Sequence, residues 1–133
     1  EPMINVYALR LLHKHHHNND VMLLASATNS VIVNPIAKRL GFENIVATEV
    51  EIIDGVYSGK CKDTPALGLG KLEKVTEWML NNNFNDFKNT TFYSDSINDL
   101  PLLAAVTKPI GVNPDNKLRE ECEKRSWEIM DLP

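Results

Sequence analysis

The stretch Thr90-Thr91-Phe92-Tyr93-Ser94-Asp95-Ser96-Ile97-Asn98-Asp99-Leu100-Pro101-Leu102-Leu103 decides the fold. An apolar run stops at Asp95, a polar turn follows, and Pro101 suits a first helical position, where a missing N–H does no harm. Asp95, Asn98 and Asp99 therefore lie between the carboxyl end of a strand and the start of a helix, the edge where open α/β sheets bind ligands. Two nearby carboxylates attract a hard cation such as Mg²⁺. The same residues also serve as plain turn formers and caps.

Composition limits the functional classes that the chain can belong to. Its 133 residues fit one domain with a real core, and its net charge of -4 argues against a general nucleic-acid binder. No run is long and apolar enough to span a membrane, and no secretory signal is visible. Two cysteines do not make a disulfide framework, so we expect a cytoplasmic protein. Because the chain begins with Glu1 and not with Met, we expect a processed protein or the downstream part of a longer one.

Strands and helices alternate along the chain, which predicts a parallel sheet with helices on both faces. The expected fold is a three-layer, Rossmann-like α/β domain with a small β-hairpin around Asp54-Gly55, a strong turn signal. The expected helices are 3–17, one ending near 40, one opening at Gly70-Lys71 and reaching 80, then 101–105 and 118–125. The expected strands are 21–25, 44–48, 89–94, 108–112 and 127–130, with the hairpin over 49–60.

Two further positions carry candidate chemistry at the same edge of this sheet. A turn of small residues, 26–30, is expected after the first strand, where backbone N–H groups and the Ser26 hydroxyl could hold an anion such as phosphate. Thr28 or Asn29 could equally be an ordinary helix N-cap there. Lys71 stands at a helix start, where the helix dipole disfavours a cation, so its place is easier to explain if it faces an anion.

The histidine cluster at His13, His15, His16 and His17 is a weak metal candidate. Consecutive histidines point in different directions around a helix. We interpret them as exposed residues in the last turn of the first helix, where positive charge is favourable.

The chain resembles the haloacid dehalogenase superfamily of phosphohydrolases, and most closely its phosphoserine-phosphatase-like subfamily. The apolar run ending in Ser26 resembles the second family motif, Gly70-Lys71 the third, and 94–103 the fourth. Residues 47–59 and 110–115 also resemble the subfamily. Each motif is weak alone, but the match covers nearly the whole chain in the right order.

The resemblance implies a Mg²⁺-dependent phosphatase acting on a small phosphomonoester, with no nucleic-acid or membrane partner. By resemblance, Asp95 binds the metal, and Asp99 supports that site directly or through water. Ser26, with Ala27 beside it, and Asn98 bind or position the phosphoryl group, and Lys71 neutralises its charge. Catalytic roles thus fall to Lys71, Asp95 and Asp99, which fits a reaction that needs positioning and charge neutralisation above all.

One departure from the family is large: these 133 residues contain no Asp-x-Asp. In the family that first motif supplies the nucleophile, which forms an aspartyl-phosphate, and the general acid/base. We therefore expect a C-terminal part of a longer phosphatase, with 1–19 leading out of a mostly absent cap and 20–133 forming the core. Its sheet should be incomplete at the N-terminal side, and the segment should be inactive alone, with the missing N-terminal segment as its partner.

Two alternatives stay open on the sequence. The missing nucleophile would suit a non-catalytic phosphate-binding or regulatory module, although such a module has no need for Ser26, Lys71 and Asp95 together. The phosphorylation domain of a cation-pumping ATPase shares a similar fourth motif, but the match around the hairpin argues against it.

Overall fold

The computed structural model describes residues 20–61 and 67–132. The expected first helix, with its histidines, lies outside the described residues. The elements, in chain order, are β1 (Leu23–Asn29), α2 (Ser30–Arg39), β2 (Asn44–Thr48), β3 (Val50–Ile53), β4 (Val56–Cys61), α3 (Leu69–Asn81), β5 (Thr91–Ser94), the 3-10 turn η1 (Ile97–Asp99), α4 (Leu100–Ala105), β6 (Lys108–Val112), α5 (Asn116–Arg125) and β7 (Glu128–Met130).

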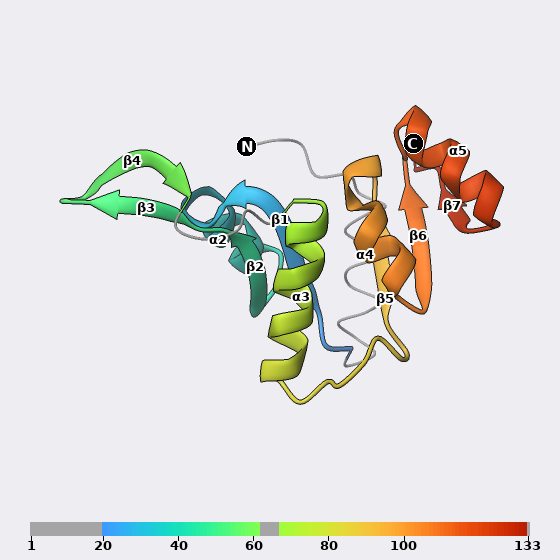
Figure 1. The fold of residues 1–133 in the computed structure, drawn as a ribbon, viewed down its shortest axis with the longest axis horizontal. Helices are drawn as coiled ribbons and strands as arrows, with labels where there is room; N and C mark the ends of the chain where they lie inside the picture. The colour runs from blue at the N-terminus through green and yellow to red at the C-terminus, as the bar shows by residue number, and fades with distance from the viewer. Residues whose placement is uncertain (1–19, 62–66, 133) are drawn as a thin grey trace.

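The described strands form two parallel groups and one antiparallel hairpin (Figure 1). β1 pairs in parallel with β2, and β6 lies between β5 and β7 in a second parallel group. The hairpin of β3 and β4 turns at Asp54 and Gly55, whose φ angles of 52° and 78° are both positive, as a type I′ turn requires. The α/β fold with a parallel sheet and a hairpin is confirmed.

The two parallel groups are not hydrogen-bonded to each other within the described residues. β1 pairs only with β2 there, and β5 only with β6, so each has one edge without a partner strand in the described part of the chain. The incompleteness of the sheet at its N-terminal side stays a prediction.

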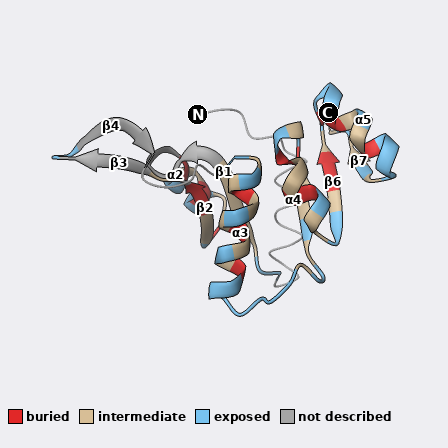
Figure 2. Ribbon diagram, in the orientation of Figure 1, coloured by how far each residue is buried: buried red, intermediate tan, exposed pale blue. Residues whose placement is uncertain are grey.

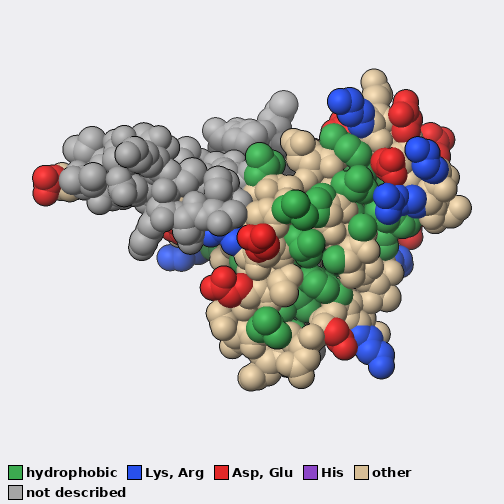
Figure 3. Space-filling view, in the orientation of Figure 1, with side chains coloured by type: hydrophobic (Ala, Val, Ile, Leu, Met, Phe, Trp, Pro, Cys, Tyr) green, Lys and Arg blue, Asp and Glu red, His purple; other side chains and the backbone are tan. Residues whose placement is uncertain are grey.

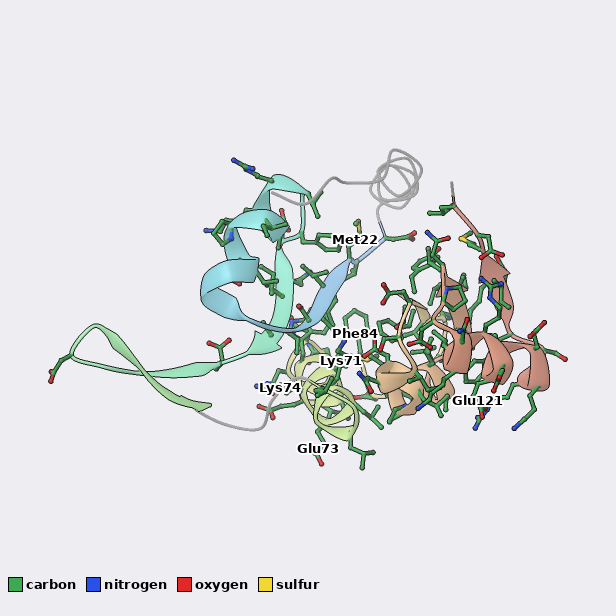
Figure 4. All side chains as sticks on the ribbon, turned by 90° about the horizontal axis from the view of Figure 1, so that it is seen from above. Met22, Lys71, Glu73, Lys74, Phe84 and Glu121 are labelled. Atoms are coloured by element: carbon green, nitrogen blue, oxygen red, sulfur yellow. The ribbon has the colours of Figure 1, made fainter. Side chains whose placement is uncertain are left out.

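Helices pack on both sides of β1 and β2, and α3 joins the two groups of strands. α2 and α3 both pack on β1 and β2, from opposite sides when the molecule is seen from above (Figure 4). α3 also packs against α4, which lies on β5 and β6. Apolar side chains gather between α3 and α4 (Figure 3), and the buried positions lie mainly on β2, β6 and the inner sides of these helices (Figure 2). One buried cluster spans both groups: Val46, Val75, Met79 and Leu102.

The end of the first strand differs most from the prediction, whereas the other described boundaries shift by at most two residues. The first strand does not end at Ala25, because β1 continues to Asn29 and α2 begins only at Ser30. β2 provides the reason: Ser26 pairs with Ala47 and Asn29 pairs with Thr48, so the extended backbone keeps hydrogen-bonding partners past residue 25. The register shifts between these two pairs, which marks a β-bulge where a turn was expected.

The described part of the chain contains no helix with the length and apolar character needed to cross a bilayer.

Candidate active site

A buried ion pair lies where α3 meets η1. The Nζ atom of Lys71 is 2.7 Å from Oδ1 of Asp99, and the two residues are only 6% and 8% exposed. Lys71 projects between the two strand groups in Figure 4. The expectation that a lysine at this helix start faces an anion is met inside the protein by a carboxylate. The ammonium can form three hydrogen bonds, so one contact with Asp99 leaves capacity for a further anion.

The Ser94 hydroxyl connects this ion pair to the turn. Ser94 ends β5 and is 7% exposed. Its Oγ donates a hydrogen bond of 2.6 Å to Oδ2 of Asp99 and accepts one of 3.1 Å from the backbone N–H of Ser96. Both carboxylate oxygens of Asp99 are therefore engaged, one by Lys71 and one by Ser94. The bond from Ser94 fixes the orientation of the Asp99 carboxylate, and that carboxylate in turn holds the Lys71 ammonium in place.

Gly68 lets α3 begin next to this turn. Its φ of 57° and ψ of -125° lie where residues with a side chain are strained, and a Cβ there would stand 3.7 Å from the Asn98 carbonyl oxygen. Gly68 is the N-cap of α3 and provides no side-chain cap. The positive end of the α3 dipole therefore points at this edge together with Lys71.

The turn itself presents Asp95 and Asn98, both of which are exposed. Ser96 caps η1 by accepting the Asn98 N–H at 3.1 Å. Asp115, the N-cap of α5, contacts the same turn: its backbone N–H donates to the Asp95 carbonyl at 2.9 Å. The hydrogen bonds that its carboxylate accepts from the N–H groups of Leu118 and Ile97 hold the pKa of Asp115 below its ordinary value.

Ser26 and Ala27 lie in β1, on the other strand group. Ser26 is half-buried and is the last residue before the register shift with β2. Since β1 and β5 both run toward the upper end of Figure 1, their carboxyl ends lie at the same edge as the start of α3. The sequence-predicted residues therefore share one edge, where Lys71 and Asp99 are in direct contact.

The donors that suit Mg²⁺ at this edge are few. No group of three or more His, Cys, Asp or Glu side chains within 20–61 and 67–132 is placed to hold a metal. Mg²⁺ needs only one or two protein carboxylates when waters and phosphate oxygens complete its octahedron. The exposed carboxylate of Asp95 fits that requirement, whereas Asp99 is buried and contacts Lys71 with one oxygen and Ser94 with the other.

Sequence reasoning missed Ser94, Gly68 and Asp115. Ser94 was treated only as the end of an apolar strand, although a buried serine directly before an Asp turn has the means to hydrogen-bond it. A Gly two residues before a Gly-Lys helix start is also a visible signal. Asp115 gave no usable signal for contact with Ile97, because the two are 18 residues apart and meet only through the pairing of β5 with β6.

The fold and this edge define a class of Rossmann-like α/β domains that bind ligands at the carboxyl ends of parallel strands. The chain belongs to the haloacid dehalogenase-like hydrolase family, whose sequence pattern matches residues 2–104.

Relatives with assigned names support a phosphatase. The chain is 35% identical to a histidinol-phosphatase of Neisseria meningitidis serogroup C (strain 8013), over 98% of this chain and 60% of that protein. It is 34% identical to phosphoserine phosphatase SerB1 of Mycobacterium tuberculosis (strain ATCC 25618 / H37Rv), over 92% of this chain and 39% of that protein. The chain thus spans no more than about three fifths of these relatives.

Solved structures agree on the fold. A protein of unknown function from Bordetella pertussis Tohama I superposes with a TM-score of 0.92 at 39% identity, covering 100% of this chain and 60% of that one. A substrate-bound phosphoserine phosphatase superposes with a TM-score of 0.72 at 17% identity, covering 92% of this chain and 56% of that one. The second likeness concerns the fold alone.

Proposed function

We propose that this chain is part of a Mg²⁺-dependent phosphomonoesterase that hydrolyses a small phosphorylated metabolite through an aspartyl-phosphate. The observation that carries the proposal is the buried contact of Lys71 with Asp99 at the sheet edge that also presents Asp95. Phosphatase relatives at 34% and 35% identity support the same chemistry. The cytoplasmic location remains part of this prediction.

In this proposal Lys71 neutralises the phosphoryl oxygens. Asp99 accepts one N–H of its ammonium and Ser94 holds Asp99, so the cation is positioned before substrate arrives. A preorganised charge of this kind stabilises the transition state without reorganisation during the reaction. Further N–H donors of the Lys71 ammonium and the positive end of α3 would bind the same phosphate.

Asp95 would hold the metal, with Asn98 and the Ser26 hydroxyl positioning the phosphoryl oxygens and Ala27 beside them at the β1 bulge. When bound, Mg²⁺ would neutralise the phosphoryl oxygens and help to align them. Asp99, given its partners, would support that site from behind by orienting Lys71. The roles of Asp95, Asn98 and Ser26 are those that the family resemblance implies.

The nucleophile would come from a segment outside these 133 residues. The chain contains no Asp-x-Asp, and Ser26 is no substitute because a serine nucleophile needs a base beside it. A parallel strand from that segment, pairing with the edges of β1 and β5, would bring an aspartate to the same sheet edge as Lys71. In this proposal residues 1–19 lead out of the cap and 20–133 form the core.

The test is a phosphatase assay on the full-length protein, with histidinol phosphate and phosphoserine among the substrates and Mg²⁺ varied. Asp95→Asn should lower turnover by about a thousandfold and weaken the response to Mg²⁺, since loss of a preorganised charge at this site typically costs about 10²–10³ in rate. Glu120→Gln, a matched removal of one exposed carboxylate on α5, should change neither.

Normal activity in Asp95→Asn would refute the metal role. The alternative of a non-catalytic phosphate-binding module would gain support if the full-length protein binds inorganic phosphate but hydrolyses no phosphomonoester. The 133-residue segment alone should be inactive in the same assay, because it lacks the Asp-x-Asp carboxylates.

A further inference from the structure

Asp115 connects the start of α5 to the turn that carries Asp95. Its Oδ1 accepts the N–H of Leu118 at 2.8 Å, which caps α5. Its Oδ2 accepts the N–H of Ile97 at 3.0 Å, and its own N–H donates to the Asp95 carbonyl at 2.9 Å. One residue thus holds two backbone groups of a turn that precedes it by 18 positions or more.

The cap alone does not explain this geometry. A helix N-cap needs one side-chain acceptor, and serine, threonine or asparagine would provide it as well as aspartate does. The second oxygen of Asp115 is aimed at Ile97, the first residue of η1, whose N–H has no partner within so short a turn. The carboxylate therefore satisfies one donor in each of two segments.

The two bonds from Asp115 lie on either side of Ser96. The carbonyl of Asp95 and the N–H of Ile97 are both held by Asp115, while Ser94 and Ser96 form hydrogen bonds within the turn. The direction of the Asp95 side chain depends on the backbone at that point. Asp115 therefore acts on the orientation of the Asp95 carboxylate through the backbone of the turn.

We propose that Asp115 is a positioning residue for the metal-binding carboxylate of Asp95, acting through the backbone of the turn. The inference rests on the proposed function of Asp95. The positioning role and the capping role of Asp115 use different carboxylate oxygens. Oδ1 caps α5 through Leu118, and Oδ2 holds the turn through Ile97.

Two substitutions separate these roles. Asp115→Ser keeps an acceptor for Leu118 but has no second oxygen for Ile97. Asp115→Asn keeps one acceptor and places an NH₂ group where Ile97 requires an acceptor. The control is Asp131→Asn, which breaks the pairing of Asp131 with Arg119, at 2.6 Å, and leaves the Asp95 turn untouched.

Amide hydrogen exchange, measured by NMR without metal or substrate, tests the contact. In Asp115→Ser the Ile97 amide should exchange about tenfold faster, and the Leu118 amide should change by less than about twofold, because serine keeps the cap. Asp131→Asn should leave both amides unchanged. Equal protection of Ile97 in the wild-type protein and both Asp115 variants would overturn the proposal.

Mg²⁺ binding to the full-length protein, measured by calorimetry, tests the consequence without turnover. Both Asp115 variants should bind Mg²⁺ about tenfold more weakly, and their half-saturating Mg²⁺ in the phosphatase assay should rise by a similar factor. The KM for substrate at saturating Mg²⁺ should stay within about twofold. Wild-type affinity in both variants overturns this inference alone. A wild-type protein that neither binds Mg²⁺ nor hydrolyses phosphomonoesters overturns the proposed function, and this inference with it.

Discussion

The Lys71 ammonium lies 2.7 Å from the Asp99 carboxylate, and both residues are more than nine-tenths buried. The pair joins the start of α3 to η1, and so links the two groups of parallel strands. Burying two charges is costly, and a protein tolerates it only when each charge has good partners. Asp99 has them, since Ser94 occupies its second oxygen.

Removing one charge of this pair should be worse than removing both. Asp99→Asn leaves the Lys71 ammonium buried without its counter-charge and should lower the free energy of unfolding by about 3 kcal/mol. The double variant Lys71→Met/Asp99→Asn buries no charge and should recover much of that loss. Urea unfolding of the two single variants and the double variant measures the coupling. Strictly additive losses would contradict a direct interaction.

Ser94→Ala should leave the Lys71 ammonium less firmly positioned. It leaves Oδ2 of Asp99 without a donor and should lower the free energy of unfolding by about 1–2 kcal/mol. In the full-length enzyme we expect about tenfold lower turnover, because Asp99 can then rotate and take Lys71 with it. Ser96→Ala, which removes only the exposed cap of η1, is the control for the turn. The prediction fails if the two variants are equally active.

Gly68→Ala should be destabilising because of the backbone and not because of a clash. The nearest atom to an added Cβ is the Asn98 carbonyl oxygen at 3.7 Å, an ordinary contact, but the φ of 57° is strained for alanine. We expect a loss of about 1–2 kcal/mol in unfolding free energy. Gly41→Ala, at φ 87° with no atom within 4 Å, should cost about as much. Activity should fall in Gly68→Ala only, since only Gly68 sets where α3 begins beside Asn98.

The thiol of Cys122 should resist alkylation in the folded protein. Burial raises the pKa of this thiol, so less of the reactive thiolate is present at any pH below that pKa. In a Cys61→Ser background, labelling at pH 8 should be slow without urea and rapid after unfolding. It should accelerate as the pH is raised, since deprotonation produces the nucleophile. Rapid labelling of the native protein would contradict the packing of α5 against β6.

The strand-helix order was predictable from the sequence because its signals are local. The observed bounds of β6 match the expected 108–112, and β5 ends at Ser94 as expected. The Asp54-Gly55 pair predicted the hairpin turn correctly, because both residues tolerate a positive φ. The end of β1 was predicted wrongly, since small polar residues resemble a turn until β2 supplies hydrogen-bonding partners to Asn29.

The candidate site also has a part that is predictable from the sequence and a part that is not. The sequence by itself determined which candidate residues lie at one sheet edge, because Asp95 directly follows a strand and Lys71 stands at the start of a helix. Only the tertiary structure decided what those residues touch. Lys71 and Asp99 are 28 positions apart, and Asp115 and Ile97 are 18 apart, so no local pattern encodes either contact. Such contacts arise when α3 packs on α4 and β6 pairs with β5, because side-chain geometry at that edge depends on helix packing and strand register.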